Sequence, residues 1–405
     1  MHDAGLVGVE LFVLLLAVAV GVALVTRRLS IPYSVALVVA GFLISLGGPI
    51  AHVTITPELI LAVMIPGLVF EAAYKIHLDE LRRSFVTVLA LAVPGVAVTA
   101  GIVAAVVHVV TGLDLALSFL LGAIVCATDP IAVVAIFKQL RAPAALATVV
   151  EAESLLNDGT GVVLFGIALT LVTATVTPES ALVTFVFTVA VSTVLGAVAG
   201  YVAIRVMNLA GDHMVEVTVS IIAAYGTYLL ADSFHWSGII ATVVVGIIIG
   251  NPGERLALSE RTTEALDLAW ETAAFLLTAL VFLLVGVVIT PAQLLVAVPV
   301  IVVGYLAMTG ARAVVVYGLI GGGQRLLPGR RKAAMPIGYL HVMFWAGLRG
   351  AIAVALVLAL PADLAQHDMI AGAVYGIVLV TLLVQGTTAG WVVRRTGVLG
   401  DAGAS

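Results

Sequence analysis

Three carboxylates lie in the middle of long apolar segments, where an ionised side chain costs at least ~2.5–3.5 kcal/mol if the segment crosses a bilayer. They are Asp129 in one segment, and Glu153 and Asp158 in the next. Ser154 and Asp158 are four residues apart, so they share one face of a helix. A carboxylate, a hydroxyl and main-chain oxygens are ligands for a small hard cation. One carboxylate that holds either a cation or a proton is the minimal site of an exchanger, although a single buried carboxylate could instead pair with an arginine.

The segment that contains Asp129 is interrupted by the residue that follows it. Pro130 lacks an N–H group and would clash with a helical carbonyl one turn back, so the helix breaks there. The break leaves the carbonyl of Thr128 without a helical partner, and that carbonyl can face a cation. The break also exposes a positive helix end. Asp129 can balance this end, although it could act as a helix cap alone.

A second apolar segment is interrupted in a similar way near its centre. Gly347 and Gly350 weaken the helix around Arg349. We expect the Arg349 guanidinium to balance the negative helix ends at the breaks, with a purely structural role as the alternative. Matching breaks in two segments are typical of a midplane ion or substrate site in a secondary transporter.

The elements that position these residues are predicted to be membrane-spanning helices. Of the 405 residues, 62% are hydrophobic and 10% are charged, whereas soluble domains carry about 25% charge. The apolar runs are long and rich in Leu, Val and Ala, so they predict helices of roughly 20 residues rather than barrel strands. The sequence therefore predicts an all-α polytopic membrane protein with about thirteen spans. Their ranges are 5–25, 32–48, 58–74, 84–110, 115–138, 144–174, 181–204, 214–231, 237–250, 265–289, 293–320, 334–360 and 368–392.

The basic residues predict the orientation of these spans. Two of the 18 Lys and Arg residues, Arg312 and Arg349, lie inside spans, and all the others follow odd-numbered spans. The positive-inside rule then places the N-terminus outside and the C-terminus in the cytoplasm. No basic region precedes the first span, so we expect that span to be retained rather than cleaved. The chain ends soon after Arg394 and Arg395, so we expect one transmembrane unit over 1–405 without a soluble regulatory domain.

The two interrupted segments are spans 5 and 12, which are seven apart in chain order. An odd offset means that they cross the membrane in opposite directions, as expected of an inverted repeat. The two repeats would be spans 1–6 and spans 8–13, with span 7 as the linker between them. The sequence thus predicts two inverted six-helix halves with discontinuous helices at spans 5 and 12.

Three motifs resemble those of the cation/proton antiporter superfamily, in its NhaP/NHE-type sodium/proton exchanger branch. They are Ala127–Pro130, Glu153–Gly161 and Gly347–Ala351. The pair Asn157-Asp158 is similar to that of the electroneutral branch, because the electrogenic branch has Asp-Asp at this place. Further matches extend from span 3 to span 13, at Phe70-Glu71, Ser237–Ala241, Trp270-Glu271, Leu280–Gly286 and Gln385-Gly386.

The resemblance implies an NhaA-like antiporter fold and a particular division of labour. A core domain around spans 4–6 and 11–13 would hold the ion site, and the remaining spans would form a dimerisation domain. The protein would be a homodimer that moves ions by an elevator-like shift. One departure from the family is Thr278, where many relatives have Asn, and we do not expect it to bear on the ion site.

The resemblance also implies roles for individual residues. Asp158 would be the shared cation and proton site, with Ser154 and the Thr128 carbonyl completing the sodium ligands. Glu153 would act through a water. The supporting residues would be Asn157, which links the two broken regions, Asp129 and Arg349, which balance charge, and Glu71 with Arg312, an ion pair that braces the core.

The function predicted from these observations is electroneutral sodium(lithium)/proton antiport in a prokaryotic inner membrane. Asn157 cannot titrate, so Asp158 exchanges one cation for one proton unless Glu153 also releases a proton. A potassium/proton antiporter remains an alternative, because a carboxylate and a hydroxyl do not fix the ion's size. A cation channel or a transport-dead sensor is a more distant alternative. We expect no enzymatic activity, no cofactor and no nucleic acid partner, because no nucleophile, metal or phosphate-loop motif stands out.

Overall fold

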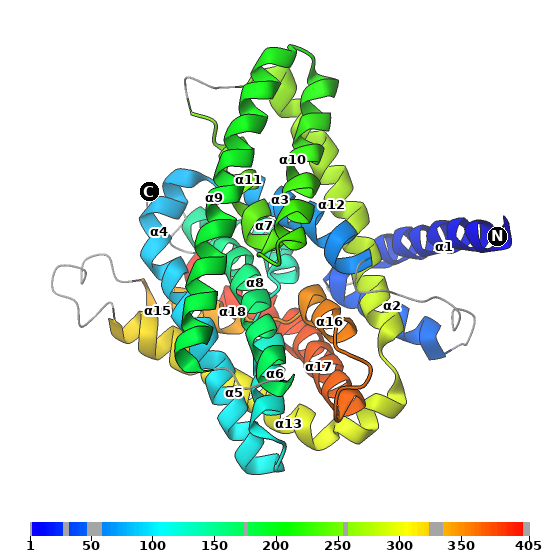
Figure 1. Cartoon of the computed structure of the whole chain (residues 1–405), viewed down its shortest axis with the longest axis vertical. Helices are drawn as coiled ribbons and strands as arrows, with labels where there is room; N and C mark the ends of the chain where they lie inside the picture. Colours follow the sequence, from blue (N-terminus) through cyan, green and yellow to red (C-terminus); the bar gives the residue numbers. More distant parts are fainter. Residues whose placement is uncertain are drawn as a thin grey trace.

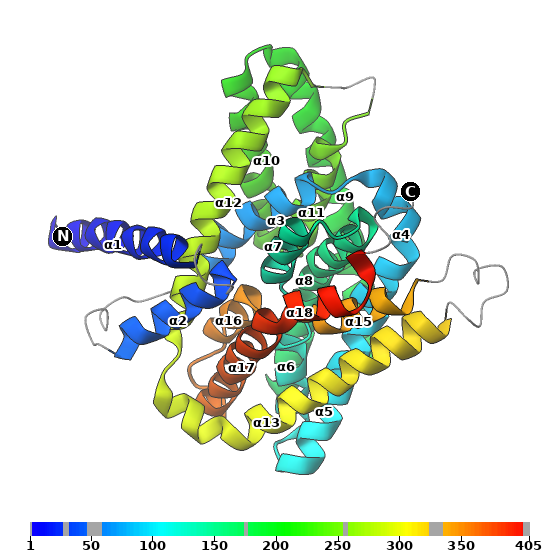
Figure 2. The ribbon, with the colours of Figure 1, turned by 180° about the vertical axis from the view of Figure 1, so that it is seen from behind.

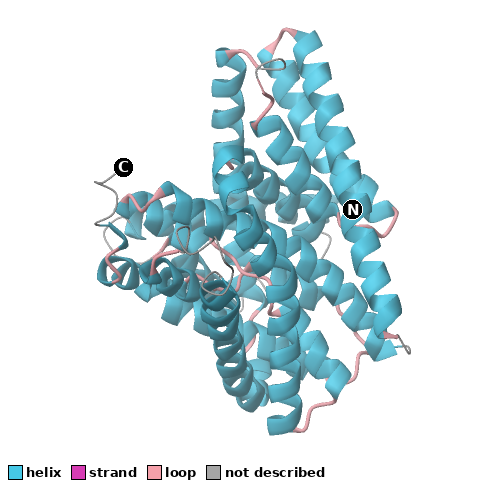
Figure 3. Ribbon diagram, turned by 90° about the vertical axis from the view of Figure 1, so that its left-hand side faces the viewer, coloured by secondary structure: helices cyan, strands magenta, loops and turns pink. Residues whose placement is uncertain are grey.

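The computed structural model describes residues 2–26, 32–46, 59–173, 177–253, 258–323 and 335–399. Within these ranges the chain is helical with short connections and has no strand (Figure 1, Figure 3). The predicted all-α fold is therefore confirmed. The segments in chain order are α1 (His2–Thr26), α2 (Tyr33–Leu46), η1 (Leu59–Met64), α3 (Ile65–Tyr74), α4 (Leu78–Ala90), η2 (Leu91–Gly95), α5 (Val96–Thr111), α6 (Leu115–Ile124), α7 (Ile131–Leu140), α8 (Ala144–Thr173), α9 (Pro178–Ala210), α10 (His213–Ser233), α11 (Gly238–Gly250), α12 (Glu260–Val288), α13 (Pro291–Ala313), η4 (Val314–Gly322), α15 (Ile337–Trp345), α16 (Ala351–Leu358), α17 (His367–Thr381), η6 (Leu382–Gly386) and α18 (Thr387–Arg395), where η marks π-helical segments.

Each predicted span coincides with one or more of these helical segments. Seven of the described helices are long and apolar enough to cross a membrane by themselves, and the other apolar helices are shorter. The number of crossings therefore stays a prediction. Some of the basic residues used to predict orientation lie outside the described residues, namely Arg27, Arg28, Arg255, Arg325, Arg330, Arg331 and Lys332.

Two helices begin several residues before the predicted spans. α4 begins at Leu78, and α12 begins at Glu260 with the Ser259 side chain as its cap. The short interfacial piece predicted at 253–263 is thus partly the start of α12, and its residues 254–257 lie outside the described part of the chain. Both first turns carry acidic side chains, which stabilise the positive end of a helix. Charged turns of this kind fall outside an apolar window even when they are helical.

The two predicted helix breaks are present, and they meet inside the bundle. Span 5 is divided into α6 and α7 around Pro130, and span 12 is divided into α15 and α16 around Arg349. The main-chain N–H of Asp129 donates a hydrogen bond of 2.8 Å to the carbonyl of Leu348. The two discontinuous helices therefore cross at their breaks, where their free main-chain groups lie side by side.

The helix contacts follow the inverted repeat. In the predicted repeat, span 2 corresponds to span 9 and span 3 to span 10. α2 of the first half packs on α12 of the second, and the corresponding pair, α11 of the second half and α3 of the first, is also in contact. The same exchange relates the contact of α1 with α12 to the contact of α10 with α3. These matching contacts agree with two halves of opposite orientation, with α9 as the connection between them.

Sets of packed helices lie toward opposite ends of the molecule. α10, α11 and α12 pack with α3 toward one end, whereas α5, α6 and α13 lie toward the other end (Figure 1, Figure 2). α9 packs on α10 and α11. α1 extends to the side and contacts α2 and α12. The α2–α12 contact is very close: a Cβ on Gly286 would lie 2.2 Å from the carbonyl oxygen of Val38. Such close backbone approach at small residues is typical of packing between membrane helices.

Candidate functional site

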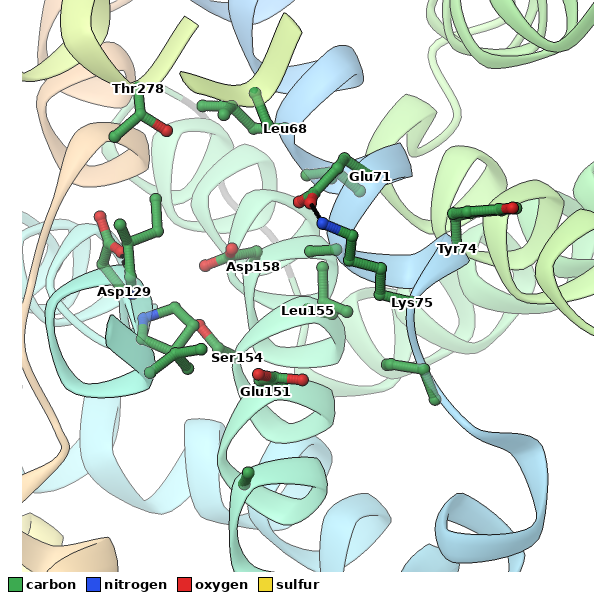
Figure 4. Close-up of a pocket in the computed structure, with 18 of the residues that line it drawn as sticks. Leu68, Glu71, Tyr74, Lys75, Asp129, Glu151, Ser154, Leu155, Asp158 and Thr278 are labelled. Atoms are coloured by element: carbon green, nitrogen blue, oxygen red, sulfur yellow. Dashed lines mark hydrogen bonds and ion pairs between the residues drawn. The ribbon is translucent and has the colours of Figure 1, made fainter. Parts of the chain in front are cut away.

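A cavity of about 860 Å³ lies beside the crossing of the two broken helices. Its walls come from α3, α7, α8, α12 and α16, and from the break before α7. Asp158 points into it from α8, with Ser154 one turn away on the same helix face (Figure 4). Among the residues that the structure describes, none donates a hydrogen bond to the Asp158 carboxylate. This carboxylate is half-buried and open to a ligand that enters the cavity.

The helical period of α8 sorts its polar residues onto two faces. Glu151, Ser154 and Asp158 line the cavity, as their spacing predicts. Glu153 and Asn157 are 1% exposed and face the protein interior instead. One helix thus presents a cavity face for ligands and a buried face that attaches it to the broken helices.

Thr128 is held against α8 by three hydrogen bonds. Its main-chain N–H donates to Asn157 Oδ1 at 3.1 Å, and Asn157 Nδ2 donates to Thr128 Oγ1 at 2.7 Å. The Ser154 hydroxyl donates to the Thr128 carbonyl oxygen. The predicted sodium ligands Thr128 and Ser154 are therefore adjacent. In the described hydrogen bonds, Asn157 reaches the first break only, whereas Asp129 and Arg349 link the two breaks.

Asp129 caps the positive ends of both broken helices. Its Oδ1 accepts from the N–H of Ile131 at 3.0 Å, at the start of α7, and its carboxylate also accepts from the N–H of Ala351, at the start of α16. A Cβ on Gly350 would lie 1.9 Å from Asp129 Oδ2, so only glycine leaves room for the carboxylate. The expected balance between Asp129 and a helix end thus extends to two helix ends.

Arg349 has the complementary position at a negative helix end. Its Nη1 donates to the carbonyls of Cys126 and Ala127, at 2.7 and 2.8 Å, just after α6 ends. The main-chain N–H of Arg349 donates to Thr381 Oγ1 at 3.2 Å, and its Nε lies 3.0 Å from Met308 Sδ. Thr381 and Met308 have no signal in the sequence, because neither is charged nor part of a recognisable motif.

The predicted ion pair between Glu71 and Arg312 is wrong. Arg312 pairs instead with Glu153: Nη1 contacts Oε1, and Nη2 lies 3.0 Å from Oε2. Arg312 Nη2 also donates to the Met343 carbonyl, at 2.8 Å in the last turn of α15. Glu71 pairs with Lys75, at 2.5 Å on the cavity wall. Arg312 is 7% exposed and needs a carboxylate at its own depth, which Glu153 provides and the cavity-lining Glu71 does not.

Thr278 lies closer to the site than expected. It lines the same cavity from α12, on the wall near Asp129 (Figure 4). Whether this departure from the family bears on the ion site is not decided by its position, and the expectation that it does not stays a prediction. The hydroxyl adds a polar group to the α12 wall, which also carries Asp267 and Glu271.

The charges around the crossing nearly cancel. The two positive groups are Arg312, which pairs with Glu153, and Arg349, which binds a negative helix end. The two negative groups are Glu153 and Asp129, which caps a positive helix end. Asp158 adds one further negative charge. One monovalent cation or one proton on Asp158 would make the set neutral, which a membrane interior favours.

Comparisons with known proteins show what the chain as a whole is similar to. Residues 13–395 match the model of the transmembrane sodium/hydrogen exchanger family. The chain is 35% identical over 398 residues to the Na(+)/H(+) antiporter ApNhaP of Aphanothece halophytica, covering 97% of this chain and 75% of that protein. It is 34% identical over 400 residues to the Na(+)/H(+) antiporter NhaH of Halobacillus dabanensis, covering 95% and 97%. The solved structure of the sodium proton antiporter MjNhaP1 from Methanocaldococcus jannaschii at pH 8 superposes with a TM-score of 0.78 at 19% identity, covering 98% and 99%.

Proposed function

The chain belongs to the sodium/hydrogen exchanger family, and from this we propose that it is an electroneutral sodium(lithium)/proton antiporter with Asp158 as the shared site. The observation that carries the proposal is the Asp158 carboxylate, which faces the cavity and receives no hydrogen bond from a described residue. A carboxylate in this position is stabilised either by a proton or by a bound cation. The two ligands therefore compete for one site, and their competition couples the two fluxes.

The cation would be held by oxygen ligands from two elements. Asp158 and Ser154 come from α8, and the Thr128 carbonyl comes from the break before α7. Ser154 now donates its hydroxyl proton to that carbonyl. For a cation to bind, the hydroxyl must rotate so that both oxygens face the ion, as a hard cation requires. When a proton replaces the cation on Asp158, the hydrogen bond between Ser154 and Thr128 re-forms.

A one-to-one exchange is supported by the pairing of the neighbouring charges. Glu153 is bound by two nitrogens of Arg312 and faces the protein interior rather than the cavity. Asn157 is an amide and does not titrate. Asp158 alone then carries the exchangeable charge, and each loaded state of the site is neutral.

Alternating access would follow from movement of the helix group that contains the breaks. We assign α4–α8, α13 and α15–α18, with the intervening η segments, to a moving core, and the remaining helices to a fixed scaffold in a homodimer. The cavity extends from Asp158 to Lys75 and Lys138. By the positive-inside rule, these lysines would lie on the cytoplasmic side of the inner membrane. The conformation described here would then be open inward.

Measuring cation/proton exchange by the Asp158→Asn variant in proteoliposomes tests the proposed site. We expect this variant to lose sodium-driven and lithium-driven proton movement, because an amide neither binds a cation strongly nor releases a proton. Asp114→Asn is the matched control: Asp114 caps α6 outside the cavity, and Asn caps helices equally well. Exchange at the wild-type level in Asp158→Asn would refute the mechanism.

The same vesicles decide between the alternative ions. Proton movement driven by sodium and lithium but not by potassium supports the proposal. Movement driven by potassium alone would instead identify a potassium/proton antiporter on the same scaffold. A steady current without coupled proton movement would identify a channel.

A further inference from the structure

The cavity has a charged wall that the exchange chemistry does not use. Lys75 follows the end of α3, and its Nζ lies 2.5 Å from Glu71 Oε1. The side chains of Lys75 and Glu71 are 33% and 16% exposed. Figure 4 shows this pair on the wall opposite Asp158 and Ser154, with Lys75 facing the space between the walls. A cation that enters from this end must pass a resident ammonium before it reaches Asp158.

The other charged groups around Lys75 are mainly carboxylates. Glu71, Asp267 and Glu271 interact electrostatically with Lys75, and Glu151 interacts with both Lys75 and Lys138. The titratable groups that line this part of the cavity are Glu71 from α3, Glu151 from α8, Asp267 and Glu271 from α12, Lys138 from α7, and Lys75 and His77 after α3. The four carboxylates outnumber the two lysines, so the entrance attracts cations, and Lys75 offsets part of that attraction.

Lys75 keeps its charge at neutral pH. Burial alone would lower the pKa of Lys75, but the hydrogen bond with Glu71 and the negative charges of Glu71, Glu271 and Asp267 together outweigh burial and raise the pKa above its ordinary value. The ammonium is therefore a permanent feature of the entrance. Because the pair is partly exposed, its main effect is on the local concentration of cations rather than on folding.

We propose that Lys75 determines the affinity for the transported monovalent cation by acting as a tethered counter-ion of Glu71 in the cavity. The Lys75 ammonium is paired with the Glu71 carboxylate, which would otherwise attract the incoming ion. Its positive charge also makes the electrostatic potential at Asp158 less negative. The inference rests on the proposed function, because it concerns access to the same carboxylate. Lys75 is a positioning residue for charge and does not touch the exchanged ion at Asp158.

The test compares the apparent KM for sodium on the cavity side in inside-out vesicles. We expect Lys75→Gln to lower this KM by about three- to tenfold with little change in kcat, because one positive charge is removed near the site. Glu71→Gln should raise the KM, since it leaves the ammonium without its partner. The double variant has the net charge of the wild type, so its KM should return to within about twofold of the wild-type value.

Two control variants separate charge from structure. Lys75→Arg keeps the positive charge and should retain the wild-type KM. Arg82→Gln removes one positive charge from an exposed position on α4 outside the cavity and should leave the KM unchanged. Raising the ionic strength with choline chloride should shrink the effect of Lys75→Gln, because salt screens partly exposed charges.

Several outcomes would overturn the proposal. An unchanged or raised KM in Lys75→Gln would do so, provided that the variant is recovered in the membrane and still exchanges ions. A Lys75→Arg variant that behaves like Lys75→Gln would do so as well, because the effect would then not depend on charge. These results leave the proposed function intact, because it is tested separately by the ion dependence of exchange and by the Asp158→Asn variant.

Discussion

At the scale of single residues, two buried arginines stabilise the carbonyl ends of the two broken helices. Arg349 binds the end of α6, and Arg312 binds the end of α15 through the Met343 carbonyl. They differ in their partners, because Arg312 is also paired with a carboxylate, Glu153. Arg312 thereby ties α13 to α8 and to α15 at once. Ser154 is the next residue on α8. The position of this predicted sodium ligand therefore depends on the ion pair between Arg312 and Glu153.

Removing Arg312 should destabilise the protein strongly. Arg312→Met leaves Glu153 as a buried carboxylate without a partner and leaves the Met343 carbonyl without a donor. Breaking a buried ion pair by removing one partner costs about 3–5 kcal/mol. We therefore expect a clear fall in the melting temperature of the detergent-solubilised variant. Arg394→Met is a matched control, because Arg394 is exposed near the end of α18.

The double variant Arg312→Met/Glu153→Met distinguishes an ion pair from simple packing. It removes both charges and should recover much of the stability lost in Arg312→Met, because no unpaired charge remains. If Arg312→Met melts like the wild type, or if the double variant adds the full cost of two separate losses, the pair does not brace the core as described.

The residue scale also shows where reading the sequence succeeds. The common face of Ser154 and Asp158 follows from the helical period, and the cavity confirms it. The partner of Arg312 does not follow from any local rule, since Glu153 is 159 residues away in the chain. Two acidic residues, Glu71 and Glu153, were available for one arginine. Only the tertiary structure, which brings Arg312 of α13 to Glu153 of α8 and to the end of α15, decides between them.

At the scale of helices, the breaks are encoded locally and the helix ends are not. Pro130 ends regular helix by its own covalent geometry, and Gly350 admits the carboxylate of Asp129, so both breaks can be predicted. The starts of α4 and α12 escaped prediction because their first turns are charged and stabilised by the helix dipole rather than by apolar burial. Which helices touch could not be predicted either, since glycines mark close contacts without naming the partner.

The contact between α2 and α12 gives a prediction at this scale. Gly286→Ala should lower the melting temperature and the yield of folded protein in the membrane. Its Cβ would lie 2.2 Å from the Val38 carbonyl oxygen and 2.7 Å from the Phe42 nitrogen. Both atoms belong to the backbone, so no side chain can rotate away and the two helices must separate.

Gly101→Ala provides the control for helix propensity. Gly101 lies within α5, and a Cβ there meets no atom within 4 Å. Alanine is the better helix former by roughly 0.5–1 kcal/mol, so this variant should be as stable as the wild type or slightly more stable. Equal melting temperatures for Gly286→Ala and the wild type would show that α2 and α12 are not held together at these glycines.

At the scale of the whole molecule, the inverted repeat brings opposite helix ends together. Two breaks crossing in one place leave two positive and two negative helix ends, which Asp129 and the two arginines stabilise. The odd offset between spans 5 and 12 predicted that the two broken helices run in opposite directions, and the structure shows that they meet at their breaks. The cavity beside the crossing depends on packing between the two halves, and no single stretch of sequence predicts its shape.

The charge balance of the whole site leads to a prediction about stoichiometry. Under the proposed mechanism, Glu153 stays paired with Arg312, and the site gains one charge either from a cation or from a proton. One-to-one exchange is then insensitive to membrane voltage and stops when the sodium and proton gradients are equal. In vesicles with a tenfold sodium gradient, worth about 1.4 kcal/mol, we expect zero net flux at a tenfold proton gradient in the same direction.

If two protons moved per sodium ion, flux at zero voltage would instead stop at a proton gradient of about threefold, and an imposed voltage would shift the balance point. Measuring that balance point with and without an imposed potential separates the two cases, since it is set by thermodynamics and does not depend on how much protein each vesicle contains.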